Sequence, residues 1–162
     1  MPPTAPGSSS RPTVAVVLAA GKGTRMRSPL PKVLHALRGR PLLAYVLDLA
    51  RSFRPSRTLV GVGHRADLVR AAVDPAPGLS LVAQEPQLGT GHAVASCLPA
   101  LEGLTGAVLV LAAAVPGLRE ETVRGLFNRH GSRISEILGA AEKDASLARA
   151  VAPGSLQAEI RH

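Results

Sequence analysis

Four short apolar runs constrain the fold of this chain more than any other feature of its sequence. They span Val14–Leu18, Thr58–Val62, Leu79–Ala83 and Ala107–Leu111. The first run shows no alternation of apolar and polar residues, which is typical of a strand buried on both faces of a sheet. Stretches with helical periodicity separate the runs. Strands that alternate with helices predict a parallel sheet connected by right-handed crossovers.

Four helices are expected between and after these strands. The first opens at Pro41 and places Leu42, Val46, Leu49 and Phe53 on one face, since these residues are three or four positions apart. The other three are expected over His64–Val73, His92–Leu101 and Arg119–His130. Together, the strands and helices predict an α/β fold, a Rossmann-like three-layer α/β/α sandwich around a mostly parallel sheet.

The length and the two ends of the chain suggest one folded domain with irregular flanks. At 162 residues, the chain corresponds to roughly one domain of about 150 residues. Residues 1–12 are rich in proline, serine and glycine, which predicts a disordered tail. We expect the folded domain over residues 13–130. Residues 131–162 are less regular, and could form a strand and a helix or be partly disordered.

Several classes of protein are disfavoured by the composition. No apolar run approaches the roughly 18 residues that cross a bilayer, so no membrane protein is expected. The amino-terminal residues lack the apolar segment of a secretory signal. The single cysteine, Cys97, cannot form an internal disulfide and fits a reducing, cytoplasmic setting. We expect Cys97 and Met26 to be buried in the core, and His92 to lie on a helix surface.

Positive charge gathers at the amino-terminal end of the chain. The formal net charge is +8, and the first acidic residue is Asp48, before which the basic residues are Arg11, Lys22, Arg25, Arg27, Lys32, Arg38 and Arg40. A local positive field favours a partner that carries phosphate, either a nucleotide or a nucleic acid. A bias toward arginine on a solvated face is the alternative. Nucleic acid is the weaker candidate because only 2% of residues are aromatic and could stack on bases.

A glycine-rich loop follows the first apolar run. The sequence from Leu18 to Met26 reads Leu-Ala-Ala-Gly-Lys-Gly-Thr-Arg-Met. Small residues after a buried strand allow backbone N–H groups to approach a phosphate, and Arg25 and Lys32 would neutralise it. These features suit phosphoryl or nucleotidyl transfer. The loop matches neither the P-loop nor the G-x-G-x-x-G pattern, and its glycines alone could mark only a tight turn.

Two further motifs complete a resemblance to a known family. The segment from Leu30 to His35 reads Leu-Pro-Lys-Val-Leu-His, and that from Gln84 to Ala93 reads Gln-Glu-Pro-Gln-Leu-Gly-Thr-Gly-His-Ala. With the glycine-rich loop, these motifs resemble the sugar-phosphate nucleotidyltransferases, also called MobA-like NTP transferases. Within them, the chain is most similar to the uridyltransferase branch that acts on N-acetylglucosamine 1-phosphate. The resemblance is close from Val14 to Pro116 and fragmentary beyond.

The resemblance implies a nucleotide-diphospho-sugar transferase fold and a reaction. The phosphate of a sugar 1-phosphate attacks the α-phosphorus of UTP, pyrophosphate leaves, and UDP-N-acetylglucosamine, a cell-wall precursor, is formed. Arg25 and Lys32 are the implied catalytic residues, which neutralise the triphosphate, and Gln84 hydrogen-bonds the uracil. The other implied nucleotide-binding residues are Leu18, Ala19, Ala20, Gly21, Gly23, Gly89 and Thr90. Residues 13–130 would form the nucleotide-binding domain, and 131–162 a shortened remnant of the sugar-binding part.

One departure from the family concerns its metal. The family places an Asp that binds Mg²⁺ after the strand at Val108–Leu111, where this chain has Ala114. A methyl group cannot ligate a hard cation, so Mg²⁺ is expected by resemblance but its ligand is missing. Glu142 or Asp144 could substitute. Three interpretations stay open: a divergent nucleotidyltransferase, a catalytically impaired nucleotide-binding module, or an incomplete fragment. A basic nucleic-acid-binding protein is the distant alternative.

The positions of three residues predict where the site lies. Gly21, Gln84 and Ala114 each come shortly after a predicted strand. In open parallel sheets, ligands bind outside the carboxyl ends of the strands. We therefore expect the three residues to meet at one edge of the sheet.

Overall fold

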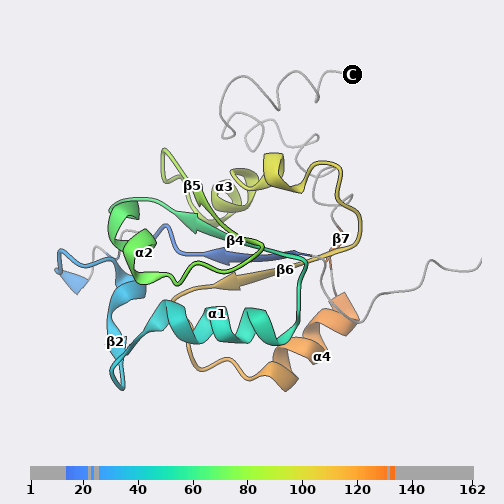
Figure 1. Ribbon diagram of the computed structural model, residues 1–162, viewed down its shortest axis with the longest axis horizontal. Helices are drawn as coiled ribbons and strands as arrows, with labels where there is room; N and C mark the ends of the chain where they lie inside the picture. The colour runs from blue at the N-terminus through green and yellow to red at the C-terminus, as the bar shows by residue number, and fades with distance from the viewer. Residues whose placement is uncertain (1–13, 22, 24–25, 131, 134–162) are drawn as a thin grey trace, which may run out of the picture.

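A five-stranded sheet forms the centre of the computed structural model, which describes residues 14–21, 23, 26–130 and 132–133 (Figure 1). Its strand order is β5-β4-β1-β6-β7. Four strands run parallel: β1 (Val14–Leu18), β4 (Arg57–Val62), β5 (Leu79–Ala83) and β6 (Ala107–Ala112). The short β7 (Ser132–Arg133) pairs antiparallel with β6. The mostly parallel sheet predicted from the sequence is therefore confirmed.

The central strand β1 is buried on both faces, as its sequence predicts. It pairs with β4 on one side and with β6 on the other. Val14 and Val16 belong to one apolar cluster, and Ala15 and Val17 belong to another, because successive side chains of a strand point to opposite faces. All four are fully buried. Each face of β1 therefore supports its own core.

Strands β5 and β6 are less buried than the similarity of the four apolar runs suggests. β5 lies at the edge of the sheet and exposes Ser80 and Ala83. β6 exposes Val110, which is 40% exposed, and Ala112. Within the described residues, the pairing between β6 and β7 involves Ala107 and Val108 of β6. In this sheet, a continuous apolar run therefore predicts a strand but does not predict how deeply that strand is buried.

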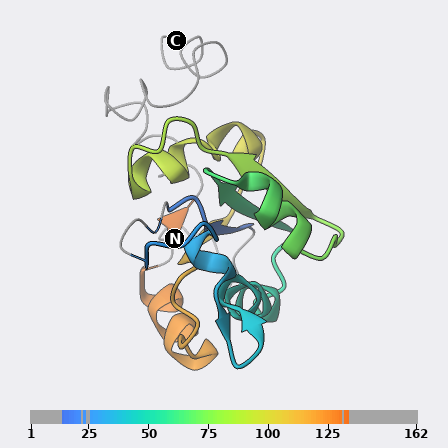
Figure 2. The same cartoon turned by 90° about the vertical axis from the view of Figure 1, so that its left-hand side faces the viewer.

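Helices cover both faces of the sheet, which gives the three predicted layers. On one face, α1 (Leu42–Ser52), α2 (Ala66–Ala72) and α4 (Glu120–His130) pack on the cluster that includes Ala15 and Val17. On the other, α3 (Thr90–Ala95) and the 3-10 helix η3 (Leu98–Leu101) pack on Val14 and Val16. Figure 2 shows α1 and α4 together on one side and α3 on the opposite side. No helix in the part of the chain that the structure describes is long and apolar enough to span a membrane.

Two helices differ from their predicted form. α1 does follow Pro41, but its buried residues are Leu43, Val46, Leu47 and Ala50, so the expected face with Leu42 and Leu49 is rotated. The single helix expected over His92–Leu101 begins at Thr90 and divides into α3 and η3. Pro99 lies in the second piece, and a proline lacks the N–H that would continue an α-helix.

The connection between β1 and α1 contains elements that the sequence did not predict. The 3-10 helix η2 (Lys32–Leu34) precedes a hairpin of β2 (Ala36–Leu37) and β3 (Arg40–Pro41). At its turn, Arg38 and Gly39 have φ values of 50° and 79°, the left-handed pair that a tight two-residue hairpin requires. The Tyr45 hydroxyl donates to the Leu37 carbonyl at 2.7 Å, which ties the hairpin to α1.

The two predicted flanks lie largely outside the described residues. The tail predicted at residues 1–12 is wholly outside them. From the predicted segment 131–162, only Ser132 and Arg133 are described, as β7. The proposed ligands Glu142 and Asp144 therefore lie outside the described residues, and the predicted domain boundaries stay predictions.

Candidate functional site

Most of the predicted nucleotide-binding residues line one cavity of about 420 Å³ at the carboxyl ends of β1, β5 and β6. We call it the amide cavity, since Gln84 and Gln87 provide its two amide side chains. Its lining residues are Leu18, Ala20, Gly21, Gln84, Gln87, Gly89, Thr90, Ala93 and Ala112. None of them is charged. Of the predicted residues, Ala19 is buried beside the cavity, and Gly23 lies in the neighbouring loop.

Gln84 is the most constrained polar residue of the amide cavity. It follows β5 directly, its backbone N–H donates to the Val62 carbonyl at 2.7 Å, and the residue is 3% exposed. Its side-chain Nε2 lies 2.9 Å from the carbonyl oxygen of Gly89 and 3.0 Å from Nδ1 of His92. The amide is therefore held between the loop before α3 and the first turn of α3.

The prediction that His92 lies on a helix surface is wrong. His92 is only 4% exposed and is one of the few buried polar residues among those described. Buried polar groups require hydrogen-bond partners, and the Gln84 amide provides one. Helical periodicity alone could not reveal this pairing, because the partner is on the segment after β5.

Gln87 lines the amide cavity and Gly63 packs against it, and neither residue was identified from the sequence as belonging to the site. A Cβ atom added to Gly63 would lie 2.0 Å from Nε2 of Gln87 and 2.9 Å from the carbonyl oxygen of Ala20. The Oε1 atom of Gln87 is buried and has no hydrogen-bond partner among the described residues. Gly63 follows β4 directly, as Gln84 follows β5, and this position was the available signal for Gly63.

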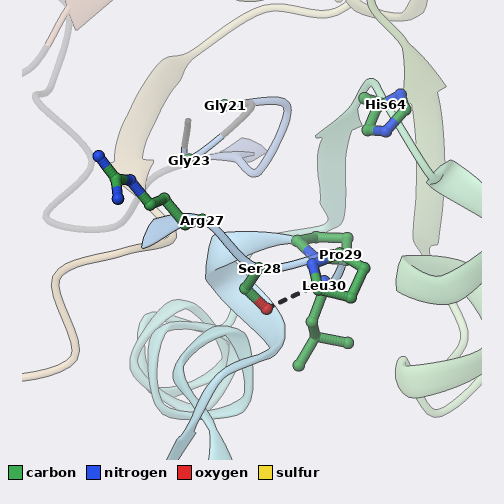
Figure 3. Close-up of a pocket in the computed structure, with 8 residues that line it drawn as sticks. Gly21, Gly23, Arg27, Ser28, Pro29, Leu30 and His64 are labelled. Carbon is green, nitrogen blue, oxygen red and sulfur yellow. Dashed lines mark hydrogen bonds between the residues drawn. The ribbon is translucent and has the colours of Figure 1, made fainter. Parts of the chain in front are cut away.

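A second cavity, of about 360 Å³, adjoins the first at Gly21. We call it the loop cavity. Its lining residues are Gly21, Gly23, Arg27, Ser28, Pro29, Leu30, Pro31 and His64. Figure 3 shows Arg27 and His64 on opposite sides of it, with the turn from Ser28 to Leu30 between them. The backbone N–H of Leu30 donates to Oγ of Ser28 at 3.2 Å.

Of the two predicted catalytic cations, the structure describes Lys32 but not Arg25. Lys32 begins η2 and is exposed. Gly23 (φ 60°) lies so close to it that an added Cβ would be 2.8 Å from Cβ of Lys32. The structure thus brings Gly23 and Lys32 together beside the loop cavity. Arg25 lies outside the described residues. Met26 was expected in the core, but it is 42% exposed, because the loop carries it away from the sheet.

The third predicted strand end is displaced from the cavity by two residues. Ala112, the last residue of β6, lines the amide cavity with Gly21 and Gln84, whereas Ala114 lies in the turn beyond. The ends of three predicted strands therefore lie together at one edge of the sheet. The residue of β6 that lines the amide cavity there is Ala112.

The described residues do not fit a Mg²⁺ site. Mg²⁺ prefers oxygen ligands, usually carboxylates, and Ala114 offers only a methyl group. No group of three or more His, Cys, Asp or Glu side chains gathers anywhere in the described ranges.

Cys97 is buried, as predicted. It separates α3 from η3, and its thiol donates to the Ala93 carbonyl at 3.4 Å. Burial raises the pKa of the Cys97 thiol to about 11, because an apolar environment disfavours the thiolate. A buried, protonated thiol is a packing group and a poor nucleophile.

A parallel sheet with cavities at the carboxyl ends of its strands is the arrangement of nucleotide-binding α/β proteins. Comparison with known proteins identifies the family within this class. The chain belongs to the MobA-like NTP transferase family, whose domain matches residues 15–162. The resemblance to nucleotidyltransferases is thereby confirmed.

Among curated relatives, the chain is 49% identical over 118 residues to the bifunctional protein GlmU of Geobacter metallireducens, which covers 73% of this chain and 25% of the relative. It is 56% identical over 111 residues to the bifunctional protein GlmU of Burkholderia thailandensis, with coverage of 68% and 24%. The chain thus spans about a quarter of the length of the curated relatives it matches.

A solved structure supports the same fold. The manganese complex of Rv0371c from Mycobacterium tuberculosis has a TM-score of 0.57 and 25% identity, and the match covers 71% of this chain and 57% of that protein. The nucleotide-diphospho-sugar transferase fold expected from the sequence is thus confirmed.

Proposed function

We propose that the amide cavity binds the uracil of UTP and that the loop cavity accommodates its phosphates. In this proposal, the chain supplies the nucleotide site for transfer of UMP to a sugar 1-phosphate. N-acetylglucosamine 1-phosphate is the proposed acceptor, by similarity to the GlmU proteins. The observation that carries the proposal is that Leu18, Ala20, Gly21, Gln84, Gly89 and Thr90 line one cavity beside the glycine-rich loop.

None of the described residues that line the amide cavity is charged, which supports the assignment of this cavity to the base. Uracil is neutral, and its edge offers both a hydrogen-bond donor and acceptors. The backbone of Gly89 and the side-chain amide of Gln84 can pair with such an edge. Leu18 and Ala20 provide apolar contact for the faces of a ring.

The loop cavity is suited to phosphate. Backbone N–H groups of a glycine-rich loop can approach phosphate oxygens closely, and Arg27 lines this cavity while Lys32 lies beside Gly23. In the proposed reaction, an oxygen of the sugar phosphate forms a bond to the α-phosphorus of UTP. The bond from that phosphorus to the bridging oxygen breaks, and pyrophosphate leaves with that electron pair. Fixed cations beside the leaving group would stabilise its charge. A cytoplasmic location, which Cys97 suggests, is part of the proposal.

A second candidate function is nucleotide binding without transfer. Ala114 favours it, because the described residues offer no ligand set for the divalent cation that would neutralise charge in the reaction. Both candidate functions use the same nucleotide site, and they differ in whether the chain catalyses transfer of UMP.

A thermal-shift titration of the purified chain with UTP, CTP, ATP and GTP tests the shared site. A ligand that binds only the folded state raises the melting temperature. We expect the largest shift with UTP. A cooperative melt that no nucleotide shifts would overturn the proposal, and an affinity for DNA or RNA that falls steeply with salt would favour the nucleic-acid alternative.

Release of pyrophosphate from UTP and N-acetylglucosamine 1-phosphate, with and without Mg²⁺, separates transfer from binding alone. We expect the Ala114→Asp variant to release pyrophosphate faster than the unmodified chain. A UTP-selective thermal shift without pyrophosphate release from either protein would establish the binding-only function.

A further inference from the structure

We infer that His92 is a positioning residue that determines which polar atom of the Gln84 amide meets the base. By holding the amide nitrogen, His92 leaves the amide oxygen for the ligand. The site then prefers bases with a ring N–H at the contacted edge, uracil or guanine, over cytosine and adenine. The identity of the ligand in this inference rests on the proposed function. The orientation of the Gln84 amide and the tautomer of His92 depend only on residues of this chain.

The orientation of the Gln84 amide follows from the partner it has on the Gly89 side. A backbone carbonyl oxygen can only accept hydrogen bonds. The amide atom 2.9 Å from the Gly89 oxygen must therefore be the nitrogen Nε2, which has two hydrogens to donate. The partners of a glutamine amide are what distinguish its two ends.

The same nitrogen fixes the tautomer of His92. Nε2 of Gln84 lies 3.0 Å from Nδ1 of His92 and has no lone pair available to accept a hydrogen bond. Nδ1 must then accept, so the imidazole is neutral and carries its proton on Nε2. The hydrogen bond at one ring nitrogen of a histidine generally determines where the proton resides.

This arrangement leaves one polar atom of Gln84 to a ligand. Both hydrogens of the amide nitrogen are engaged, and among the described residues no hydrogen bond ends on Oε1. Gln84 lines the amide cavity. An oxygen there pairs with N3–H of uracil or N1–H of guanine. The corresponding ring nitrogen of cytosine or adenine carries a lone pair, so its approach would leave a buried acceptor unpaired.

The tautomer can be tested without any nucleotide. Long-range ¹H–¹⁵N correlation spectra of the uniformly ¹⁵N-labelled protein at pH 8, where an unperturbed imidazole is neutral, distinguish the two tautomers of each histidine. The signal absent from His92→Asn identifies His92. We expect its proton on Nε2. A proton on Nδ1 would overturn the inference whether or not the chain binds UTP.

The consequence for the ligand is tested by the ratio of CTP to UTP dissociation constants. His92→Leu removes the acceptor, and we expect the ratio to fall roughly fivefold, the effect of about one hydrogen bond. His92→Asn can place its Oδ1 near the position of Nδ1 and should restore most of the ratio. Ser96→Ala is the matched control, because its hydroxyl donates to the backbone carbonyl of His92 and leaves the ring untouched.

The outcomes separate the two proposals. If the unmodified chain prefers UTP and His92→Leu retains the same ratio, the positioning role is wrong while the proposed function stands. If the unmodified chain binds no nucleotide but its His92 proton is on Nε2, the proposed function is wrong and the hydrogen-bond polarity is correct. Equal ratios in His92→Asn and His92→Leu would also contradict the inference, because the conservative variant should recover the preference.

Discussion

The amide cavity and the loop cavity adjoin at Gly21 and are built in opposite ways. Among the described residues, none that lines the amide cavity is charged, and hydrogen bonds to the Gly89 carbonyl and to Nδ1 of His92 hold the side chain of Gln84. The loop cavity contains Arg27 and His64, and backbone geometry shapes it: Gly23 and Arg27 both have positive φ. Base recognition requires a fixed pattern of donors and acceptors, whereas phosphate recognition requires charge and accessible backbone N–H groups.

Because of this difference, the amide cavity and the loop cavity should respond to different perturbations. A change in the amide cavity should affect every ligand that contains the base, with or without phosphates. A change in the loop cavity should affect only phosphorylated ligands, and the effect should weaken with salt, since exposed charges are screened beyond about 10 Å at 0.1 M ionic strength.

The largest effect is expected from Gln84→Leu. It leaves the Gly89 carbonyl and Nδ1 of His92 without their partner in a buried site, at a cost of about 2 kcal/mol. Affinities for UTP and for uridine should both fall about thirtyfold in isothermal titration calorimetry. Gln87→Leu is the comparison variant, since it removes a buried oxygen that has no partner among the described residues, and it should not destabilise the fold in urea. A loss confined to UTP would show that Gln84 does not contact the base.

Gly63→Ala should have the next largest effect. Its Cβ would collide with Nε2 of Gln87 and approach the Ala20 carbonyl, so the free energy of unfolding should fall by about 1.5 kcal/mol, and UTP affinity should fall with it. Gly117→Ala is the matched control, because nothing lies within 4 Å of its added Cβ. Urea unfolding followed by circular dichroism measures both variants, and equal changes in the two would contradict close packing at Gly63.

Arg27→Ala tests the loop cavity. Loss of one cation beside the phosphates should lower UTP affinity roughly fivefold at low salt, by analogy with other charge-assisted contacts, and leave uridine affinity unchanged. Arg70→Ala is the control, because Arg70 is an exposed arginine on α2 that lines neither cavity. Equal losses for uridine and UTP in Arg27→Ala would end the distinction between the two cavities.

The smallest effect concerns Cys97, next to the α3 helix that borders the amide cavity. Because burial raises its thiol pKa to about 11, labelling by a thiol reagent at pH 8 should be slow, and UTP should slow it further. The folded state holds this proton more tightly than the unfolded state, so the free energy of unfolding should decrease as pH rises from about 9 toward 11. Cys97→Ala, measured alongside, removes this contribution and isolates it from other groups. Rapid labelling would contradict the burial.

Several features of the fold and of the candidate site could be predicted from the sequence. The strands and the residues at their ends were predictable, because β1, β4, β5 and β6 are marked by apolar runs, and carboxyl ends of parallel strands converge. Gln84 and Gly89 followed from that convergence together with the family motif. These features depend on local pattern and on general topology.

The remaining features depend on contacts between distant segments. The burial of His92 requires Gln84 as its partner, and the need for glycine at position 63 requires the side chain of Gln87. The loop cavity depends on the backbone path from Gly23 to Pro31. In this path Arg27 has a positive φ, a backbone conformation that usually favours glycine. No periodicity encodes such a path, which is why Arg27 and His64 were not recognised as lining residues and Met26 was assigned to the core.

The position of β1 in the sheet has a consequence for the order of folding events. β1 is close to the amino terminus, yet its two neighbours are distant in sequence, with Val14 opposite Arg57 in β4 and Val108 in β6. During synthesis, the second edge of β1 can pair only after β6 has been made, when almost the whole described domain has been synthesised. Pairings at such sequence separation slow folding and prolong the exposure of apolar strand edges. A nascent chain that stops before β6 would leave the centre of the sheet as an open edge, the structure from which strand-mediated aggregation begins.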